Sequence, residues 1–71
     1  MSLSNFNKVN ASLEKQVKKA LPFAEANLNA AWSDYREVDD QKLASLISNA
    51  LAMDFTPCMT AIKIVRSNHD A

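Results

Sequence analysis

The chain has 71 residues with no glycine, two prolines and one cysteine, and its eight basic residues balance eight acidic ones. This length allows a single domain, residues 1–71, near the lower limit at which a hydrophobic core holds a fold alone. Rossmann and P-loop phosphate sites are excluded because both motifs require glycine, and the common hairpin turns also depend on it. The composition therefore predicts an all-α fold, with asparagine expected at left-handed helix ends.

The first half of the chain carries one apolar stripe with helical spacing. Large apolar residues recur every three or four positions, at Phe6, Val9, Leu13 and Val17. This pattern predicts a helix over residues 5–20. Pro22 then favours a stop and a second helix over 22–36, because proline is tolerated in a first turn but breaks hydrogen bonding inside a helix. The alternative is one kinked helix, since the stripe continues in phase as far as Tyr35.

The polar segment before residue 40 is the clearest boundary. Asp39 has the character of an N-cap, and Val38 and Leu43 occupy the two positions of a hydrophobic staple. These signals predict a helix over residues 40–53.

A last helix is predicted over residues 57–67. Thr56 is the expected cap, and Pro57 suits the first helical position, where its missing N–H has no cost. The β-branched residues Ile62, Ile64 and Val65 leave a strand as the alternative, which would have to pair across a dimer.

The fold class is thus all-α, a small bundle of three to four amphipathic helices. A homodimer is favoured over a monomer, because so short a chain needs stabilisation beyond its own core. The predicted core comprises the large apolar residues of these stripes: Phe6, Val9, Leu13, Val17, Leu21, Leu28, Trp32, Leu43, Leu46, Ile47, Leu51, Ile62 and Val65.

Charge is segregated along the chain. Residues 1–24 carry four lysines and one glutamate, a net charge of +3, and residues 25–54 carry six acids and two bases, a net charge of −4. Two solvated helix faces that attract each other across an antiparallel pair are the simpler interpretation. The alternative is a partner-binding patch formed by Asp34, Glu37, Asp39 and Asp40.

Two aromatic residues precede that patch. Trp32 and Tyr35 belong to the residue types that contribute most binding energy at protein interfaces. Trp32 as a core anchor is the competing interpretation. The candidate partner-binding residues are therefore Trp32, Asp34, Tyr35, Glu37, Asp39 and Asp40.

No constellation for catalysis is present in the sequence. His69, the only histidine, is two residues from the last position, and Cys58 lacks a neighbouring base, so a core cysteine is favoured over a nucleophile. Asp34, Glu37 and Asp40 recur every third residue, but no second set of acids completes a magnesium site. We predict no catalytic residue, no cofactor and no metal, and hence no enzyme.

The location and the nucleic-acid alternative follow from charge and hydropathy. No apolar run reaches the length of a membrane span, so the cytoplasm is the expected compartment and no membrane partner is expected. Residues 40–67 have the outline of a helix-turn-helix, which makes a DNA-binding regulator the alternative function. Its first recognition turn lacks the arginine, asparagine and glutamine residues that read base edges, so nucleic acid is the less favoured partner.

Two short segments carry a resemblance. Trp32-Ser33-x-Tyr35 and Lys63-x-x-Arg66-x-x-His69-Asp70 resemble segments of small helical proteins encoded by phages, over less than a third of the chain and without a catalytic motif. The resemblance implies a phage or mobile-element product of a kind that binds a host protein. The predicted function is a small non-enzymatic regulator or inhibitor that binds protein through a helical surface.

Overall fold

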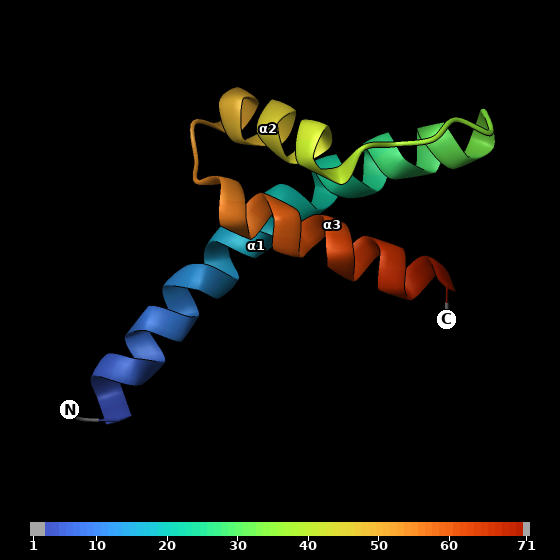
Figure 1. Cartoon of the computed structure of the whole chain (residues 1–71). Helices are drawn as coiled ribbons and strands as arrows, with labels where there is room; N and C mark the ends of the chain where they lie inside the picture. The colour runs from blue at the N-terminus through green and yellow to red at the C-terminus, as the bar shows by residue number, and fades with distance from the viewer. Residues whose placement is uncertain (1–2, 71) are drawn as a thin grey trace.

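The computed structural model of the chain describes the backbone of residues 3–70 and the side chains of residues 12–70. Three helices make up this part of the chain: α1 (Leu3–Ser33), α2 (Asp40–Leu51) and α3 (Phe55–Asp70) (Figure 1). Residues 3–70 contain no strand, so the prediction of an all-α fold is confirmed and the strand alternative for residues 62–65 is wrong. None of the three helices is long and apolar enough to cross a membrane.

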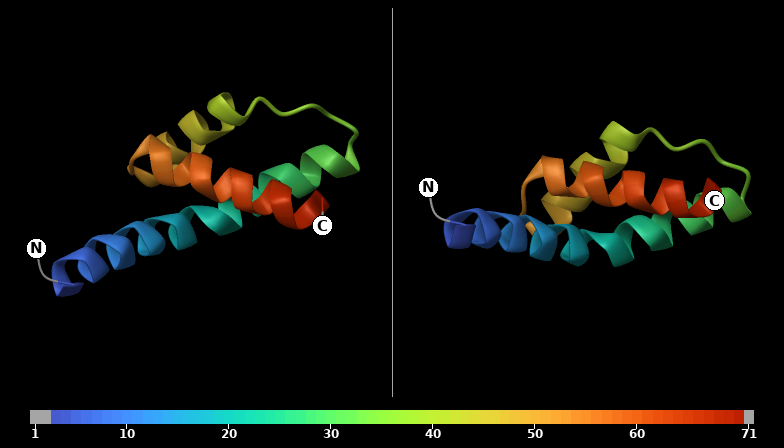
Figure 2. Two further views of the ribbon diagram at one scale, coloured as in Figure 1. Left: turned by 60° about the horizontal axis from the view of Figure 1, so that its bottom comes forward. Right: turned by 90° about the horizontal axis from the view of Figure 1, so that it is seen from below.

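Helix α1 is continuous through Pro22, which makes the prediction of two helices over 5–20 and 22–36 wrong. The proline lies on the exposed side of the helix, between the buried Ala20 and Ala24. Its ring therefore does not disturb the packed face, and the carbonyl of Lys18 that loses its N–H partner belongs to an exposed residue. The helix bends near its middle, as Figure 1 and the right view of Figure 2 show, and proline is a usual cause of such bends.

The boundary before α2 forms as the sequence predicts. The Asp39 carboxylate accepts hydrogen bonds from the backbone N–H groups of Gln41 (2.9 Å) and Lys42 (3.3 Å). Val38 is half-buried against the core and Leu43 is buried, as expected for the two ends of a staple. Helix α1 ends at Ser33 and not at residue 36, so residues 34–39 form the linker between α1 and α2.

Helix α2 ends at Leu51, two residues before the predicted end, because Ala52 adopts the left-handed conformation with φ 51° and ψ 53°. The Met53 N–H then bonds to the Ser48 carbonyl at 3.0 Å and closes the helix end. Within residues 3–70 the positive-φ residues are Tyr35 and Ala52. The expectation that asparagine takes these positions is therefore wrong.

Helix α3 begins at Phe55, so Thr56 is not its cap and the predicted bounds of 57–67 are too narrow. Pro57 still lies in the first turn, where no intrahelical N–H is required, and it is buried. The Thr60 hydroxyl donates to the Thr56 carbonyl at 3.1 Å, which shows that Thr56 already belongs to the helix. The helix continues to Asp70, and His69 therefore has a helical position.

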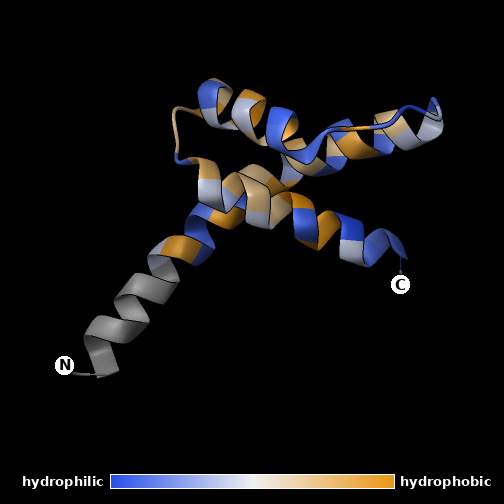
Figure 3. Cartoon of the chain, viewed as in Figure 1, coloured by the Kyte–Doolittle hydropathy of each residue, from blue (hydrophilic) through white to orange (hydrophobic). Residues whose placement is uncertain are grey.

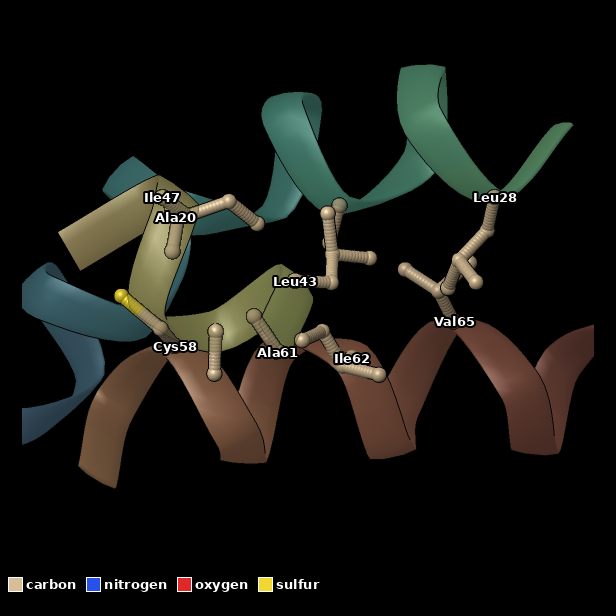
Figure 4. Close-up of a cluster of buried hydrophobic side chains, with 10 residues drawn as sticks. Ala20, Leu28, Leu43, Ile47, Cys58, Ala61, Ile62 and Val65 are labelled. Atoms are coloured by element: carbon tan, nitrogen blue, oxygen red, sulfur yellow. The ribbon is translucent and has the colours of Figure 1, made fainter. Parts of the chain in front are cut away.

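The core lies where the three helices cross, and Figure 4 shows its side chains directed toward one another. Five predicted core residues are buried: Leu28, Leu43, Ile47, Ile62 and Val65. Four more are half-buried and pack against them: Val17, Leu21, Trp32 and Leu51. Leu13 and Leu46 are 48% and 58% exposed, so their assignment to the core is wrong. Phe6 and Val9 lie outside the described side chains.

Much of the contact surface consists of small residues that the prediction omitted. They are fully buried: Ala20, Ala24, Ala31, Ala44 and Ala61. Small side chains let helix axes approach closely, because interaxial distance depends on the side chains at the contact. The larger residues that share the helical stripe, such as Leu21 and Trp32, are then displaced to the margins of the core.

Candidate partner-binding surface

The six candidate residues lie on the linker from α1 to α2 and in the helix turns that flank it (Figure 1). We call this set the corner surface: Trp32, Asp34, Tyr35, Glu37, Asp39 and Asp40. Trp32 belongs to the last turn of α1, Asp40 begins α2, and the other four occupy the linker. Figure 3 shows that this linker is mostly hydrophilic, apart from Val38, which packs against the core.

Among the described side chains Tyr35 is the most exposed of the large apolar and aromatic residues, at 98% of its surface, and its φ is 57°. The left-handed conformation costs a residue with a side chain about 1–2 kcal/mol relative to glycine, and bulky residues adopt it rarely. The turn is fixed by backbone hydrogen bonds from Tyr35 N–H to the Trp32 carbonyl (3.2 Å) and from Arg36 N–H to the Ala31 carbonyl (2.8 Å). The structure thus holds a tyrosine side chain away from its own core.

Asp40 forms an ion pair within the chain. Its carboxylate accepts from Arg66 Nε at 2.8 and 3.1 Å and lies 2.6 Å from a terminal guanidinium nitrogen of Arg66. Arg66 also donates to the Val38 carbonyl at 3.1 Å. Both side chains retain about a third of their exposure, so this contact is a partly buried, two-pronged ion pair that fixes the linker onto α3.

The other acids of the corner surface differ in the hydrogen bonds and ion pairs they form. Asp39 caps α2, whereas Asp34 lies 3.6 Å from Arg36 in a solvent-exposed pair of little energetic value. Glu37 is exposed and forms no ion pair with another described side chain. The described lysines of α1 form no ion pair with these acids, and Lys18 pairs with Glu14 within α1 at 3.3 Å. The acidic patch therefore leaves Glu37 and Asp34 as the charges most open to a partner.

Trp32 is half-buried, and its indole stacks on the His69 imidazole with ring centroids 3.6 Å apart and planes 11° from parallel. The stack closes one end of a cleft between α1 and α3 whose wall also includes Leu21, Glu25, Asn29 and Ile64. Trp32 thus combines a core contact with a partly exposed edge. The sequence offered no sign of the stack, since it joins residues 37 positions apart through tertiary packing.

A second groove lies beside the linker, between α1 and α2. It is lined in part by Asn27, Arg36, Glu37, Lys42 and Leu46. Leu46 is an exposed large apolar residue in this groove and is flanked by polar side chains. We call this depression the α2 groove, and it gives the corner surface an apolar neighbour within reach of the same partner.

The groups considered for chemistry do not assemble into a reactive site. Cys58 is fully buried, and burial, followed by the nearby Asp54 charge, raises the pKa of its thiol. The prediction of a core cysteine is therefore confirmed. Within the described residues Asp34, Glu37 and Asp40 do not gather into a metal-ligating group.

The same contacts bear on the helix-turn-helix alternative. In α3, which corresponds to the predicted recognition helix, Arg66 is held by Asp40. Lys63 remains exposed, and the Thr60 hydroxyl donates to its own helix. Comparison of the chain with protein families, curated proteins and solved structures finds no match.

Proposed function

We propose that the chain is a small non-enzymatic protein-binding regulator or inhibitor, and that its partner docks on the corner surface and the adjoining α2 groove. Tyr35 is the observation that carries the proposal. A fully exposed tyrosine in a left-handed turn contributes nothing to the core and carries a conformational cost. Tyrosine is also among the residues most enriched at the energetic centres of protein interfaces.

Preorganisation supports the same proposal. The linker is bonded at its start through the turn at Tyr35 and at its end through the Asp39 cap and the Asp40–Arg66 pair. Binding to a segment that is already ordered loses less conformational entropy than binding to a free loop. The corner surface is therefore suited to present Tyr35 in one orientation.

The charges indicate what kind of partner fits. Glu37 and Asp34 are exposed on either side of Tyr35 in the sequence, and Leu46 supplies exposed apolar surface in the α2 groove. A complementary partner has a pocket for the tyrosine ring, basic residues around it and an apolar residue for the groove. By binding there, the chain would occupy a basic functional surface of the partner, which is how it would inhibit or regulate it.

The test is a pull-down with identification by mass spectrometry, using wild type, Tyr35→Gly and Phe23→Ala. Glycine removes the ring but suits the left-handed backbone, so loss of binding in Tyr35→Gly does not reflect unfolding. Phe23 is an exposed aromatic residue on α1, distant from the linker in sequence, and its removal is the matched control. We expect a protein retained by wild type and Phe23→Ala but not by Tyr35→Gly. Equal retention by all three, or by none, contradicts the proposal.

A further inference from the structure

The cleft between α1 and α3 is largely separate from the corner surface, and we call it the α1–α3 cleft. Its volume is about 310 Å³, at the lower end of the range for small-molecule sites, about 300–1,000 Å³. Four residues of each helix line it: Leu21, Glu25, Asn29 and Trp32 from α1, and Ile64, Val65, Asn68 and His69 from α3. Trp32 is the one lining residue that also belongs to the corner surface, so the two surfaces can be tested separately.

The apolar part of this cleft leaves hydrophobic surface in contact with solvent. Val65 is buried and Leu21 is half-buried, but Ile64 is 38% exposed although it is a large aliphatic residue. The stacked rings of Trp32 and His69 form the aromatic end of the cleft. A ligand with a hydrophobic body would remove this apolar surface from water, and that removal favours binding.

Three polar side chains also line the cleft, those of Glu25, Asn29 and Asn68. Within residues 12–70 none of them forms a hydrogen bond or an ion pair. Asn27, which lines the α2 groove instead, donates to the Phe23 carbonyl at 2.7 Å. The cleft therefore offers a ligand one carboxylate and two carboxamides, each of which can donate and accept.

The charges on the α1 side of the cleft favour a cation. Glu25 is the one formally charged group of the lining at pH 7, where His69 counts as neutral. Lys18 falls on the same side of α1 as Glu25, seven residues earlier, which is about two helical turns. Its ammonium group pairs with Glu14, further along α1 from the cleft, at 3.3 Å. Glu25 thus has no cation of its own chain at hand.

The helix ends and the charges of α3 also favour a cation. Helices α1 and α3 run in the same direction where they pack, as Figure 4 shows, and Trp32 and His69 are the second-last residues of these helices. Both helix C-termini, which carry a partial negative charge, therefore lie toward one end of the cleft. Among the cations of α3, Arg66 is paired with Asp40, and Lys63 is not a lining residue.

We propose that the α1–α3 cleft binds a small organic cation, a primary amine with an aromatic or branched aliphatic body. An ammonium group has three N–H donors, and the Glu25 carboxylate and the amide oxygens of Asn29 and Asn68 offer one acceptor group for each. The hydrophobic body lies against Leu21 and Ile64. A neutral ligand forgoes the ion pair, and an anionic ligand is repelled by Glu25.

Fluorescence titration tests the proposal, because Trp32 is the only tryptophan and lines the cleft. The probes are phenethylamine, its neutral analogue phenethyl alcohol and the anion hydrocinnamate, each added to wild type at pH 7 up to the millimolar range. We expect a saturable change with the amine, binding about tenfold weaker with the alcohol, and none with the anion. No saturable change with the amine, or equal binding of amine and alcohol, overturns the proposal.

The same titration with Glu25→Gln and Glu37→Gln tests the assigned carboxylate. Both residues are exposed, so neither change opens the core, and Glu37 is the matched control outside the cleft. We expect Glu25→Gln to bind phenethylamine about tenfold more weakly than wild type, with unchanged helical circular dichroism, and Glu37→Gln to bind it like wild type. Wild-type affinity in Glu25→Gln, or equal weakening in both variants, contradicts the proposal.

Discussion

The linker from α1 to α2 and the turn from α2 to α3 differ in what holds them in place. Each has a left-handed residue that is not glycine, Tyr35 in the linker and Ala52 in the turn from α2 to α3. The turn is short and lies against the core, with Met53 half-buried beside it and Pro57 and Cys58 buried at the start of α3. The linker is longer and hydrophilic, and polar contacts from Asp39 and Arg66 hold it in place.

The residue types at the two left-handed positions show what differs. Alanine is the smallest residue with a side chain, so Ala52 meets the needs of a helix end at modest conformational cost in a chain without glycine. Tyrosine at the equivalent position adds a large ring that is 98% exposed. The turn is explained by folding alone, whereas the linker is explained only if the ring has a use outside the fold.

The largest effect is expected in the core beneath the turn. Ile62→Ala should lower the free energy of unfolding by about 2–5 kcal/mol, because Ile62 is fully buried among all three helices. Thermal and urea denaturation followed by circular dichroism would measure the loss. Leu46→Ala is the control, with a change of about 0.5 kcal/mol or less because Leu46 is exposed. Comparable losses in both variants would contradict the burial described for α2 and α3.

The next largest effect is expected at the ion pair that anchors the linker. Arg66→Ala should cost about 1–2 kcal/mol, between the values for exposed and buried pairs, because both partners keep about a third of their exposure. A double-mutant cycle with Asp40→Ala isolates the pair, and hydrogen exchange at the amides of residues 36–40 should rise in each single variant. Lys63→Ala, an exposed cation three residues earlier in α3, is the control. No coupling energy in the cycle would show that the linker is held without this pair.

A smaller effect is expected at the helix cap. Asp39→Ala should cost about 1 kcal/mol, because two backbone N–H groups of α2 lose their acceptor. Asp39→Asn keeps an acceptor oxygen and should recover most of the loss, which denaturant titration can resolve. If asparagine is no better than alanine, charge at the helix N-terminus matters more than the hydrogen bonds.

Short-range sequence patterns were sufficient to predict some features of the fold. The Asp39 cap and the start of α2 depend on residues within three positions of one another, so short-range rules identify them. The continuity of α1 did not follow from such rules, because packing of Ala20 and Ala24 offsets the local cost of Pro22. The alanine contacts were missed for a related reason, since a small residue gains importance only from a neighbouring helix.

The candidate surface, too, could be predicted only in part from the sequence. Its residues were chosen by type, and their position at one corner follows from being close in sequence. The anchoring role of Arg66 and the stack of His69 on Trp32 depend on how α3 crosses α1 and α2, which no pattern within one segment encodes.

The smallest effect is expected from glycine substitutions at the two left-handed positions, and these variants distinguish the two positions most clearly. Ala52→Gly and Tyr35→Gly should each raise the free energy of unfolding by about 0.5–1 kcal/mol, because glycine adopts positive φ without steric cost, less its greater entropy in the unfolded chain. Thermal melts of both variants measure this gain, with Ala50→Gly inside α2 as a control that should lose stability. If the turn serves only folding, Ala52→Gly keeps full partner binding, while Tyr35→Gly becomes more stable and loses it. A Tyr35→Gly variant that melts lower than wild type would mean that the ring supports the fold after all, and the contrast between the two connections would then disappear.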